Sequence, residues 1–255
     1  MTAALTSATT PPTVRRVRHE TRIRPLEVTA VDRLTPHMIR IALRGDDMAD
    51  FISASPDDHL KVLIDGPEGE RQMRDYTPRR FSCEDQTLLL DFAVHDAGPA
   101  TQWALDARPG DQLNIGGPRG SRIIEGDIRN WLLIGDETAL PAIGRRIEEA
   151  SADTQFTTVI AIPGPDDRQT FDTAAKVNSV WIYRPVADAA KAEPFMKVIE
   201  DVTVTDDTFV WIAAEGLVTR GLRQHFLDTR QHPPNWLKAA GYWVKGQADT
   251  TESFE

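Results

Sequence analysis

The sequence predicts a small antiparallel β-barrel in its first half, followed by a parallel-sheet α/β domain. Between residues 25 and 125 the apolar segments are short and end at turns rich in Pro, Gly or Asp, which is typical of a small barrel. After residue 126, apolar strands alternate with helical segments, as they do in βαβ units. We therefore expect a disordered tail over 1–13, a barrel domain over 14–126 and an α/β domain with a C-terminal extension over 127–255.

Five short segments of the first half have the length and residue types of β-strands. They are LEVTAVDRL (26–34), HMIRIALRG (37–45), HLKVLI (59–64), TLLLDFAV (87–94) and DQLNIGG (111–117). One helical segment over 99–107 interrupts them and ends before the Pro109-Gly110 turn. Ahead of the strands, a basic stretch runs from Arg15 to Arg24. We interpret it as a solvated arm that leads into the first strand.

In the second half, strands and helices alternate. The expected strands are NWLLIGD (130–136), TTVIAIP (157–163), SVWIYR (179–184) and TFVWIAAE (208–215), and the expected helices lie within 139–150, 189–200 and 217–230. Ligands of an open parallel sheet bind outside the carboxyl ends of its strands. We therefore expect two ligands to meet in a cleft between these strand ends and the barrel.

Composition narrows the classes of partner. The chain has 29 Lys and Arg against 39 Asp and Glu, and the formal charge of −10 argues against nucleic acid. No run of 18 apolar residues occurs, so we expect no contact with a membrane interior. The single cysteine, Cys83, excludes an internal disulfide and any multi-cysteine metal site, and no histidine pair has ligand spacing. The first dozen residues lack the features of a signal peptide. We expect a cytoplasmic monomer without a protein-bound metal.

The string Arg74-Asp75-Tyr76-Thr77-Pro78-Arg79 is the first with functional content. On an extended segment its two arginines can present guanidinium groups to phosphate. Between them, Tyr76 offers a flat face to a ring and Thr77 offers a hydroxyl to a ring nitrogen. A polar loop with surface arginines is the alternative interpretation.

Two further strings carry weaker signals. Asp91-Phe92-Ala93-Val94-His95 leads through a Gly-Pro turn into a helix that starts near Ala100, and unpaired N–H groups at such a start attract pyrophosphate. An ordinary helix start has the same sequence features. Gly116-Gly117-Pro118-Arg119-Gly120-Ser121 is a tight turn with one arginine at its tip, a pattern that a structural hairpin shares.

Together the three strings resemble the siderophore-interacting protein family, the flavin-dependent ferric-siderophore reductases of the ferredoxin-NADP reductase-like superfamily. The strings DDHLK, WIAAEG and GYWVKG occur in the same order as in that family, and the resemblance covers residues 20 to 246. It implies that the barrel binds FAD and that the parallel-sheet domain is of the NAD(P)H-binding type.

The resemblance also implies which residues bind the cofactor. Arg74, Tyr76, Thr77 and Arg79 match the FAD motif, in which the tyrosine lies against the flavin and an arginine faces phosphate. The second string supplies the strand that edges the flavin and the helix start that takes the pyrophosphate. The matching residues are Asp91, Phe92, Val94, His95, Ala100 and Thr101.

On the nicotinamide side the resemblance is less direct. The loop after the first strand of the second domain holds Asp136, Glu137, Thr138 and Ala139, and Glu215 follows a later strand. Carboxylates repel phosphate, which weakens the inference of tight NAD(P)H binding. Arg168 and Arg184 could meet a 2′-phosphate, so we favour NADPH slightly over NADH.

For an anionic ferric siderophore, the resemblance points to three cations beside the flavin. These are Lys61 in DDHLK, Arg119 in GPRGS and Lys238 in WLKAAGYW, with Lys245 as a weaker fourth. The alternative interpretation is that each of these residues is an ordinary solvated cation. We assign no catalytic residue beyond the flavin and no role to Cys83.

The expected function is reduction of siderophore-bound Fe(III) by electrons that pass from NADPH or NADH through FAD, with release of Fe(II) in the cytoplasm. The flavin would carry the electron chemistry and the protein would orient its ligands. Two alternatives stay open. One is the same reduction with ferredoxin as the electron donor, and the other is a non-enzymatic siderophore-binding or carrier flavoprotein.

Overall fold

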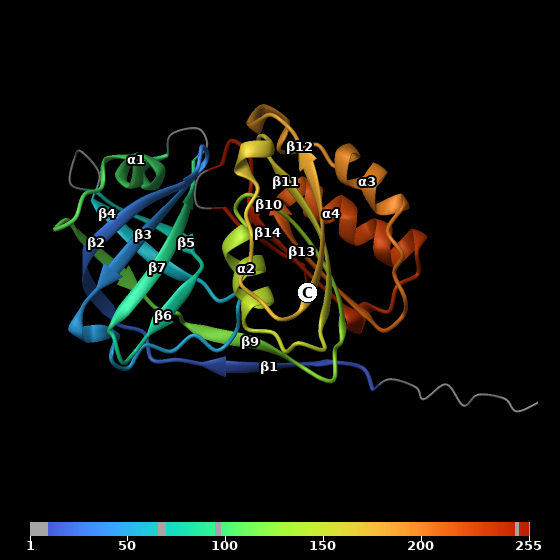
Figure 1. The fold of residues 1–255 in the computed structure, drawn as a ribbon, viewed down its shortest axis with the longest axis horizontal. Coiled ribbons are helices and arrows are strands. Elements are labelled where there is room, and N and C mark those ends of the chain that lie inside the picture. Colours follow the sequence, from blue (N-terminus) through green and yellow to red (C-terminus); the bar gives the residue numbers. More distant parts are fainter. Residues whose placement is uncertain (1–9, 66–69, 95–97, 248–249, 255) are drawn as a thin grey trace, which may run out of the picture.

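The computed structural model describes residues 10–65, 70–94, 98–247 and 250–254. Figure 1 shows two units side by side, an antiparallel sheet at the left and a parallel sheet with helices at the right. None of the helices in the described residues is long and apolar enough to cross a membrane.

Seven strands form the antiparallel sheet, in the order β5-β4-β8-β2-β3-β7-β6. They are β2 (Ile23–Thr35), β3 (Met38–Arg44), β4 (Leu60–Asp65), β5 (Arg71–Tyr76), β6 (Arg80–Ser82), β7 (Thr87–Ala93) and β8 (Gln112–Gly116). The two edge strands, β5 and β6, are joined by residues 77–79 alone, so the sheet must curl until its edges approach each other. Alternating residues of the strands fill one interior core, which Ala100 and Ala104 of α1 (Pro99–Asp106) complete.

A two-stranded ribbon lies outside this sheet. It consists of β1 (Thr13–Arg18) and β9 (Gly120–Glu125), which pair antiparallel along their whole length. Figure 1 shows it below both units. The basic stretch is therefore not simply a solvated arm, because residues 13–18 have a strand partner. Of the expected disordered tail, residues 1–9 lie outside the described residues, and Thr13 is the first residue of β1.

The second sheet has the order β12-β11-β10-β13-β14-β15, and all its strands except β15 are parallel. They are β10 (Asn130–Asp136), β11 (Gln155–Ile162), β12 (Lys176–Tyr183), β13 (Thr208–Glu215), β14 (Leu237–Trp243) and β15 (Glu252–Ser253). The strand order reverses between β10 and β13, because β11 and β12 lie on one side of β10 and β13 and β14 lie on the other. A ligand crevice is expected at the carboxyl ends flanking such a point.

Helices cover both faces of the parallel sheet. They are α2 (Leu140–Glu148), α3 (Glu193–Glu200) and α4 (Gly216–Gln224). A π-helical turn over His225–Thr229 and short 3₁₀ turns over Pro165–Asp167, Val186–Asp188 and Pro234–Trp236 belong to the same unit, whereas the 3₁₀ turn over Asp46–Met48 belongs to the barrel. The α3 and α4 helices share one core with the sheet. The core on the α2 face also contains Met38 and Ala93 of the first unit, so apolar packing joins the two units.

Candidate functional site

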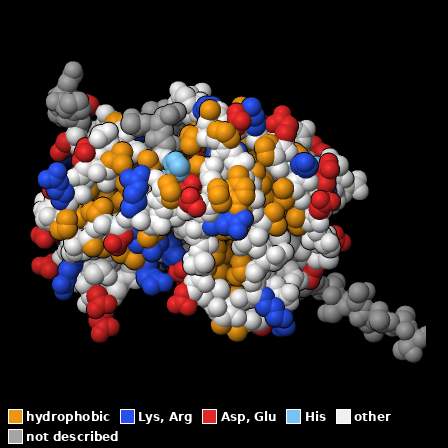
Figure 2. Space-filling view, turned by 45° about the horizontal axis from the view of Figure 1, so that its top comes forward, with side chains coloured by type: hydrophobic (Ala, Val, Ile, Leu, Met, Phe, Trp, Pro, Cys, Tyr) orange, Lys and Arg blue, Asp and Glu red, His pale blue; other side chains and the backbone are white. Residues whose placement is uncertain are grey.

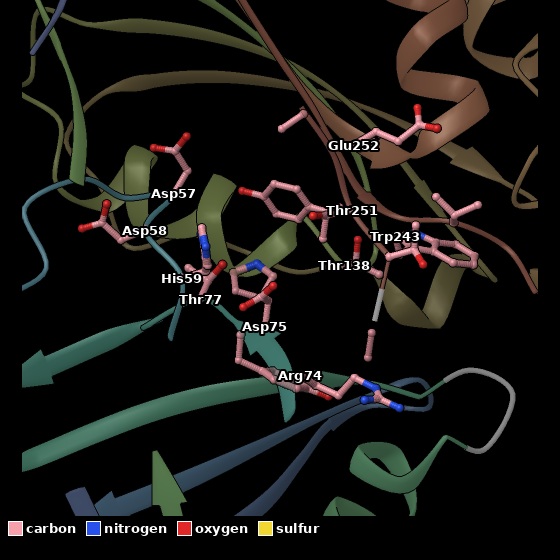
Figure 3. Close-up of a pocket in the computed structure, with 18 of the residues that line it drawn as sticks. Asp57, Asp58, His59, Arg74, Asp75, Thr77, Thr138, Trp243, Thr251 and Glu252 are labelled. Atoms are coloured by element: carbon pink, nitrogen blue, oxygen red, sulfur yellow. The ribbon is translucent and has the colours of Figure 1, made fainter. Parts of the chain in front are cut away.

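A cleft of about 1000 Å³ lies between the two units. From the first unit it is lined by the end of β5, the start of α1 and the ribbon. From the second unit it is lined by the loop after β10, by residues of β14 and by the segments 244–247 and 250–252. In Figure 3, Arg74, Asp75 and Thr77 lie on one side, and Thr138, Trp243, Thr251 and Glu252 lie on the other. Figure 2 shows basic side chains gathered at the junction of the units.

Four residues of the first string line this cleft, namely Arg74, Asp75, Tyr76 and Thr77. Arg74 and Tyr76 are two apart on β5, and Thr77 follows the strand. The Arg74 guanidinium donates to the Met73 carbonyl and to Oε1 of Gln72, which are both neutral acceptors. The Tyr76 ring packs on Phe92 with centroids 4.2 Å apart, and burial raises the pKa of its hydroxyl.

The start of α1 also opens into the cleft. Its N-cap is Gly98, no side chain caps the helix, and Ala100 and Thr101 line the cavity. The first-turn N–H groups are therefore available to an anion. His95 lies outside the described residues. Phe92 and Val94 belong to the barrel core rather than the cleft.

Asp91 lines the cleft as well, but its carboxylate is already engaged. Arg40 binds it through two hydrogen bonds of 2.7 and 2.8 Å. The pair lies across the β3–β7 ladder, where Arg40 and Asp91 are register partners. Asp91 therefore holds the strand edge of the cleft in place.

Arg79 lies outside the cleft. Its guanidinium forms two hydrogen bonds, of 2.8 and 2.6 Å, with Glu148 of α2. A Cβ on Gly144 would lie 3.0 Å from this guanidinium, so the glycine lets the arginine cross the helix closely. Arg79 thus links the segment that joins β5 and β6 to α2 of the second unit.

On the parallel-sheet side, Glu137 and Thr138 line the cleft, whereas three other expected residues do not. Asp136 is buried and accepts hydrogen bonds from the Thr138 N–H and hydroxyl, the Glu215 N–H and the Trp243 indole. Glu215 caps α4 by accepting from Leu217 and Val218, and Ala139 is core. Asp136, Ala139 and Glu215 are therefore buried residues that support the loop after β10 and do not face the cleft.

Glu137 is paired with Arg184, at 2.8 and 3.4 Å. Burial and the neighbouring Asp136 raise the pKa of Glu137 to about 7, against the opposing attraction of Arg184. The Arg184 guanidinium is buried by this pair and is not presented to a phosphate. Arg168 differs, because it is exposed and stacks on the exposed ring of Tyr183, with its Cζ 5.3 Å from the ring centroid.

The three expected substrate cations have different surroundings. Lys61 does not line the cleft and its Nζ lies 3.0 Å from Asp75. Lys238 lines it, with its Nζ 2.5 Å from Asp57. Arg119 lines it and is exposed. The three cations therefore do not form one cluster of positive charge in the cleft, because Lys61 and Lys238 are each paired with an aspartate.

Sequence reasoning missed Asp57, although DDHLK was noticed. Its carboxylate meets Lys238 of β14, Arg146 of α2 at 3.4 Å and the Trp211 indole of β13 at 3.2 Å. Burial alone would raise its pKa, but Lys238 and Arg146 hold the pKa of Asp57 well below its usual range. This carboxylate joins the first unit to three elements of the second.

Sequence reasoning also missed the ribbon as a wall of the cleft. Arg16 and Arg18 of β1 and Arg122 of β9 line it, together with Ser121. The run of arginines from Arg15 was the available signal, but its strand partner lies far along the chain. Within the described residues, no group of three or more His, Cys, Asp or Glu could hold a metal ion.

Comparisons with known proteins agree with this architecture. The family model described as "Siderophore-interacting protein" matches residues 128–246, and that described as "Siderophore-interacting FAD-binding domain" matches residues 27–73 and 65–122. A curated relative, the NADPH-dependent ferric-chelate reductase of Escherichia coli K12, is 33% identical over 252 residues, covering 92% of this chain and 98% of its own.

Solved structures show the same arrangement. A siderophore utilization protein from T. fusca superposes with a TM-score of 0.85 at 31% identity, over 94% of this chain and 98% of that one. The siderophore-interacting protein SipS from Aeromonas hydrophila gives 0.76 at 26% identity, over 89% and 93%. The ferredoxin reductase of carbazole 1,9a-dioxygenase, at 17% identity, gives 0.68 over 85% and 68%.

The barrel, the parallel sheet and the cleft between them define a ferredoxin reductase-like fold. The chain belongs to the siderophore-interacting protein family. The predicted resemblance and the predicted fold class are both confirmed.

Proposed function

We propose that this protein is an FAD-dependent ferric-siderophore reductase, which passes electrons from NADPH or NADH to siderophore-bound Fe(III). The observation that carries the proposal is the single cleft into which Arg74, Tyr76, the uncapped start of α1 and the loop after β10 all open. Both the barrel and the parallel sheet contribute to it, as a two-ligand electron transfer requires. Family membership and the ferric-chelate reductase name of the E. coli relative support the same reading.

The described residues fit FAD. Among the described residues, the Arg74 guanidinium donates only to neutral acceptors, so its charge is available to a phosphate. The first-turn N–H groups of α1 lack a side-chain cap and suit a pyrophosphate. Tyr76 and Thr77 would hold the ring system, with Asp91 fixing the adjacent strand edge. When bound, FAD supplies the conversion of a two-electron donor to one-electron delivery.

The chain's own residues then orient the ligands. Arg74 and the α1 start would anchor the cofactor, while Thr138 and Glu137 form the opposite wall where a nicotinamide would enter. Trp243 is held by its indole bond to Asp136 and closes that side of the cleft. Fe(II) binds hard oxygen chelators more weakly than Fe(III), so reduction itself would release the iron.

We propose NADPH as the preferred donor, through Arg168 rather than Arg184. The Arg168–Tyr183 stack is exposed at the carboxyl end of β12, where an adenosine 2′-phosphate could bind. The name of the E. coli relative, an NADPH-dependent enzyme, favours this donor. The loop after β10 repels phosphate less than its two carboxylates indicate in the sequence, because Asp136 and Glu137 already have partners.

We further propose that the protein acts as a cytoplasmic monomer, with an FAD domain over 14–126 and a nucleotide domain over 127–255. One chain supplies both walls of the cleft, which supports a monomer. A single cysteine suits a reducing compartment.

One series of measurements tests the function. The purified protein should be yellow, and chromatography of the extracted cofactor should identify FAD. Under anaerobic conditions, stopped-flow mixing should show faster reduction by NADPH than by NADH or reduced ferredoxin. Adding a ferric tris-catecholate with an Fe(II)-specific dye should then give colour. A protein that stays colourless with added FAD would instead be a siderophore-binding module. If reduced ferredoxin reduces the flavin and neither NADPH nor NADH does, ferredoxin is the electron donor.

A further inference from the structure

His59 is the one histidine among the described residues that line the cleft. It directly precedes β4 and stands between two buried residues, Asp58 and Leu60. The Asp58 carboxylate accepts hydrogen bonds from three serines, Ser53, Ser55 and Ser121. The backbone on either side of His59 is therefore held in place, while the imidazole itself is exposed.

On one side, the pairing of β4 with β5 brings His59 to the residues expected to hold the flavin. Leu60 is the register partner of Tyr76, so the next pair along the two chains is His59 and Thr77. Figure 3 shows the His59 and Thr77 side chains next to each other in the cleft. In our proposed function Thr77 would hold the ring system of FAD, so the imidazole lies close to the source of electrons.

On the other side, β4 pairs with β8, where Lys61 faces Gly116. The two strands are antiparallel, so the turn that follows Gly116 lies level with the residues that precede Lys61, His59 among them. This turn carries Arg119, which lines the cleft and is one of the expected substrate cations. His59 thus stands between the place expected for the flavin and the place expected for the chelate.

The carboxylates around His59 already have partners. Figure 3 shows Asp57, Asp58 and Asp75 near its ring. Asp57 forms ion pairs with Lys238 and Arg146, Asp75 forms one with Lys61, and Asp58 accepts from the three serines. In the part of the chain that the structure describes, none of these carboxylates forms an ion pair or hydrogen bond with His59. The imidazole can therefore reach a ligand in the cleft.

Other proton-bearing groups of the cleft are less suited to give a proton to the chelate. Burial raises the pKa of the Tyr76 and Tyr242 hydroxyls, so both hold their protons. Glu137 lies on the opposite wall and is paired with Arg184. Histidine is the type of side chain that gains and loses a proton near neutral pH. An exposed imidazole can also regain its proton from water.

We propose that His59 is a catalytic proton donor, which protonates a catecholate oxygen of the ferric chelate as the iron is reduced. The inference rests on the proposed function. In this step the iron gains one electron from reduced FAD and becomes Fe(II). The imidazolium N–H bond breaks, an O–H bond forms on the chelate oxygen, and the bond between that oxygen and the iron breaks. The imidazole then takes a proton from water.

The proton transfer and the electron transfer favour each other. Catecholate oxygens are hard anionic ligands, which stabilise Fe(III) more than Fe(II). An oxygen that takes a proton loses its hold on the iron, so the remaining complex is easier to reduce and releases Fe(II) more readily. A positioned general acid typically accelerates such a step by about 10² to 10⁴-fold.

The test isolates the step between flavin and iron. The FAD-loaded protein is reduced anaerobically with dithionite, and stopped flow mixes it with a ferric tris-catecholate and an Fe(II)-specific dye. In H59Q, flavin reoxidation and Fe(II) colour should both be about 10- to 100-fold slower than in the wild type, because water replaces an exposed donor only in part. Ferricyanide takes an electron while keeping its ligands and needs no proton, so both proteins should react with it equally fast.

Three further measurements separate proton donation from a structural role. The Kd of oxidised H59Q for the tris-catecholate, from quenching of tryptophan fluorescence, should differ from that of the wild type by less than about twofold. Added imidazole should restore most of the rate that H59A loses and leave the wild type unchanged. H225Q makes the same change at a histidine that does not line the cleft, and it should react as the wild type does.

The outcomes distinguish this role from the proposed function. If the reduced wild type transfers no electron to the tris-catecholate, the reductase proposal fails and the role of His59 falls with it. If the wild type reduces the chelate and H59Q does so equally fast, the reductase proposal stands and only the role of His59 is withdrawn. Equal losses with the tris-catecholate and ferricyanide, or no rescue of H59A by imidazole, would also overturn the role of His59.

Discussion

Glu137 shows how the surroundings of one side chain set its chemistry. It lines the cleft, is almost fully buried and pairs with Arg184. Because its pKa in the folded protein, about 7, lies above the ordinary 4.5, the carboxyl is neutral below pH 7 and charged above it. An electron donor that carries phosphates therefore meets the negative charge of Glu137 only above about pH 7.

We expect kcat/KM for NADPH to fall as pH rises through about 7, because ionised Glu137 repels the donor. The E137Q variant, which cannot ionise, should lack this inflection. Rates measured between pH 5.5 and 8.5 check the prediction, with the exposed E84Q variant as control. An identical profile in E137Q would assign the inflection to another group.

At the scale of elements, α2 is the contact between the barrel edge and the parallel sheet. Its Glu148 receives Arg79, and its Arg145 donates to the Ser53 carbonyl and hydroxyl and to the Pro78 carbonyl. These bonds fix the β5–β6 connection, and through it the end of β5. The two arginines of the first string therefore have separate tasks, one toward the cleft and one toward α2.

This separation can be measured. We expect R74A to weaken FAD binding by about 1.5–3 kcal/mol, because a charge-assisted phosphate contact is lost. R79A should instead lower the free energy of unfolding by about 3 kcal/mol, because Glu148 loses its main partner in a buried pair. A double-mutant cycle of R79A with E148A, followed by urea unfolding, should show strong coupling. FAD affinity that falls equally in R74A and R79A, with unchanged stability, would return Arg79 to the phosphate.

At the scale of the whole molecule, Asp57 of the first unit forms ion pairs with two residues of the second unit. It lies in the loop before β4 and binds Arg146, Trp211 and Lys238 from α2, β13 and β14. The cleft is bounded by the same elements, so its width depends on this junction. Met38 and Ala93 also pack against the α2 face of the parallel sheet. This hydrophobic contact holds the units together but, unlike the ion pairs, does not fix their orientation.

We expect D57N to destabilise the protein by about 3 kcal/mol at pH 7, since two half-buried cations, Arg146 and Lys238, lose their carboxylate. The pKa of Asp57 is lowered in the folded state, so its contribution is present above the unfolded pKa of the carboxyl and is lost as pH falls through the folded one. Thermal unfolding from pH 3 to 8 should thus show a gap between wild type and D57N that narrows in acid. The exposed D166N variant should show no gap at any pH.

Much of the fold could be predicted because its signals are local. The apolar segments at 37–45, 87–94 and 208–215 match β3, β7 and β13 to within a residue or so. Strands without such a pattern were missed: β1 and β5 carry several charged residues, and β6 has three residues. A strand of this kind forms because a partner is placed beside it.

Family and fold class were determined by the sequence alone, because residue order and the periods of strands and helices are properties of neighbouring positions. The residues of the cofactor motif stay a prediction. Which charges stay available in the cleft was decided only by the tertiary structure. Lys61 and Lys238 are neutralised by Asp75 and Asp57, whereas Arg18 and Arg119 are brought together by β-pairing. Electrostatic partnership depends on distance in space, which no spacing along the chain specifies.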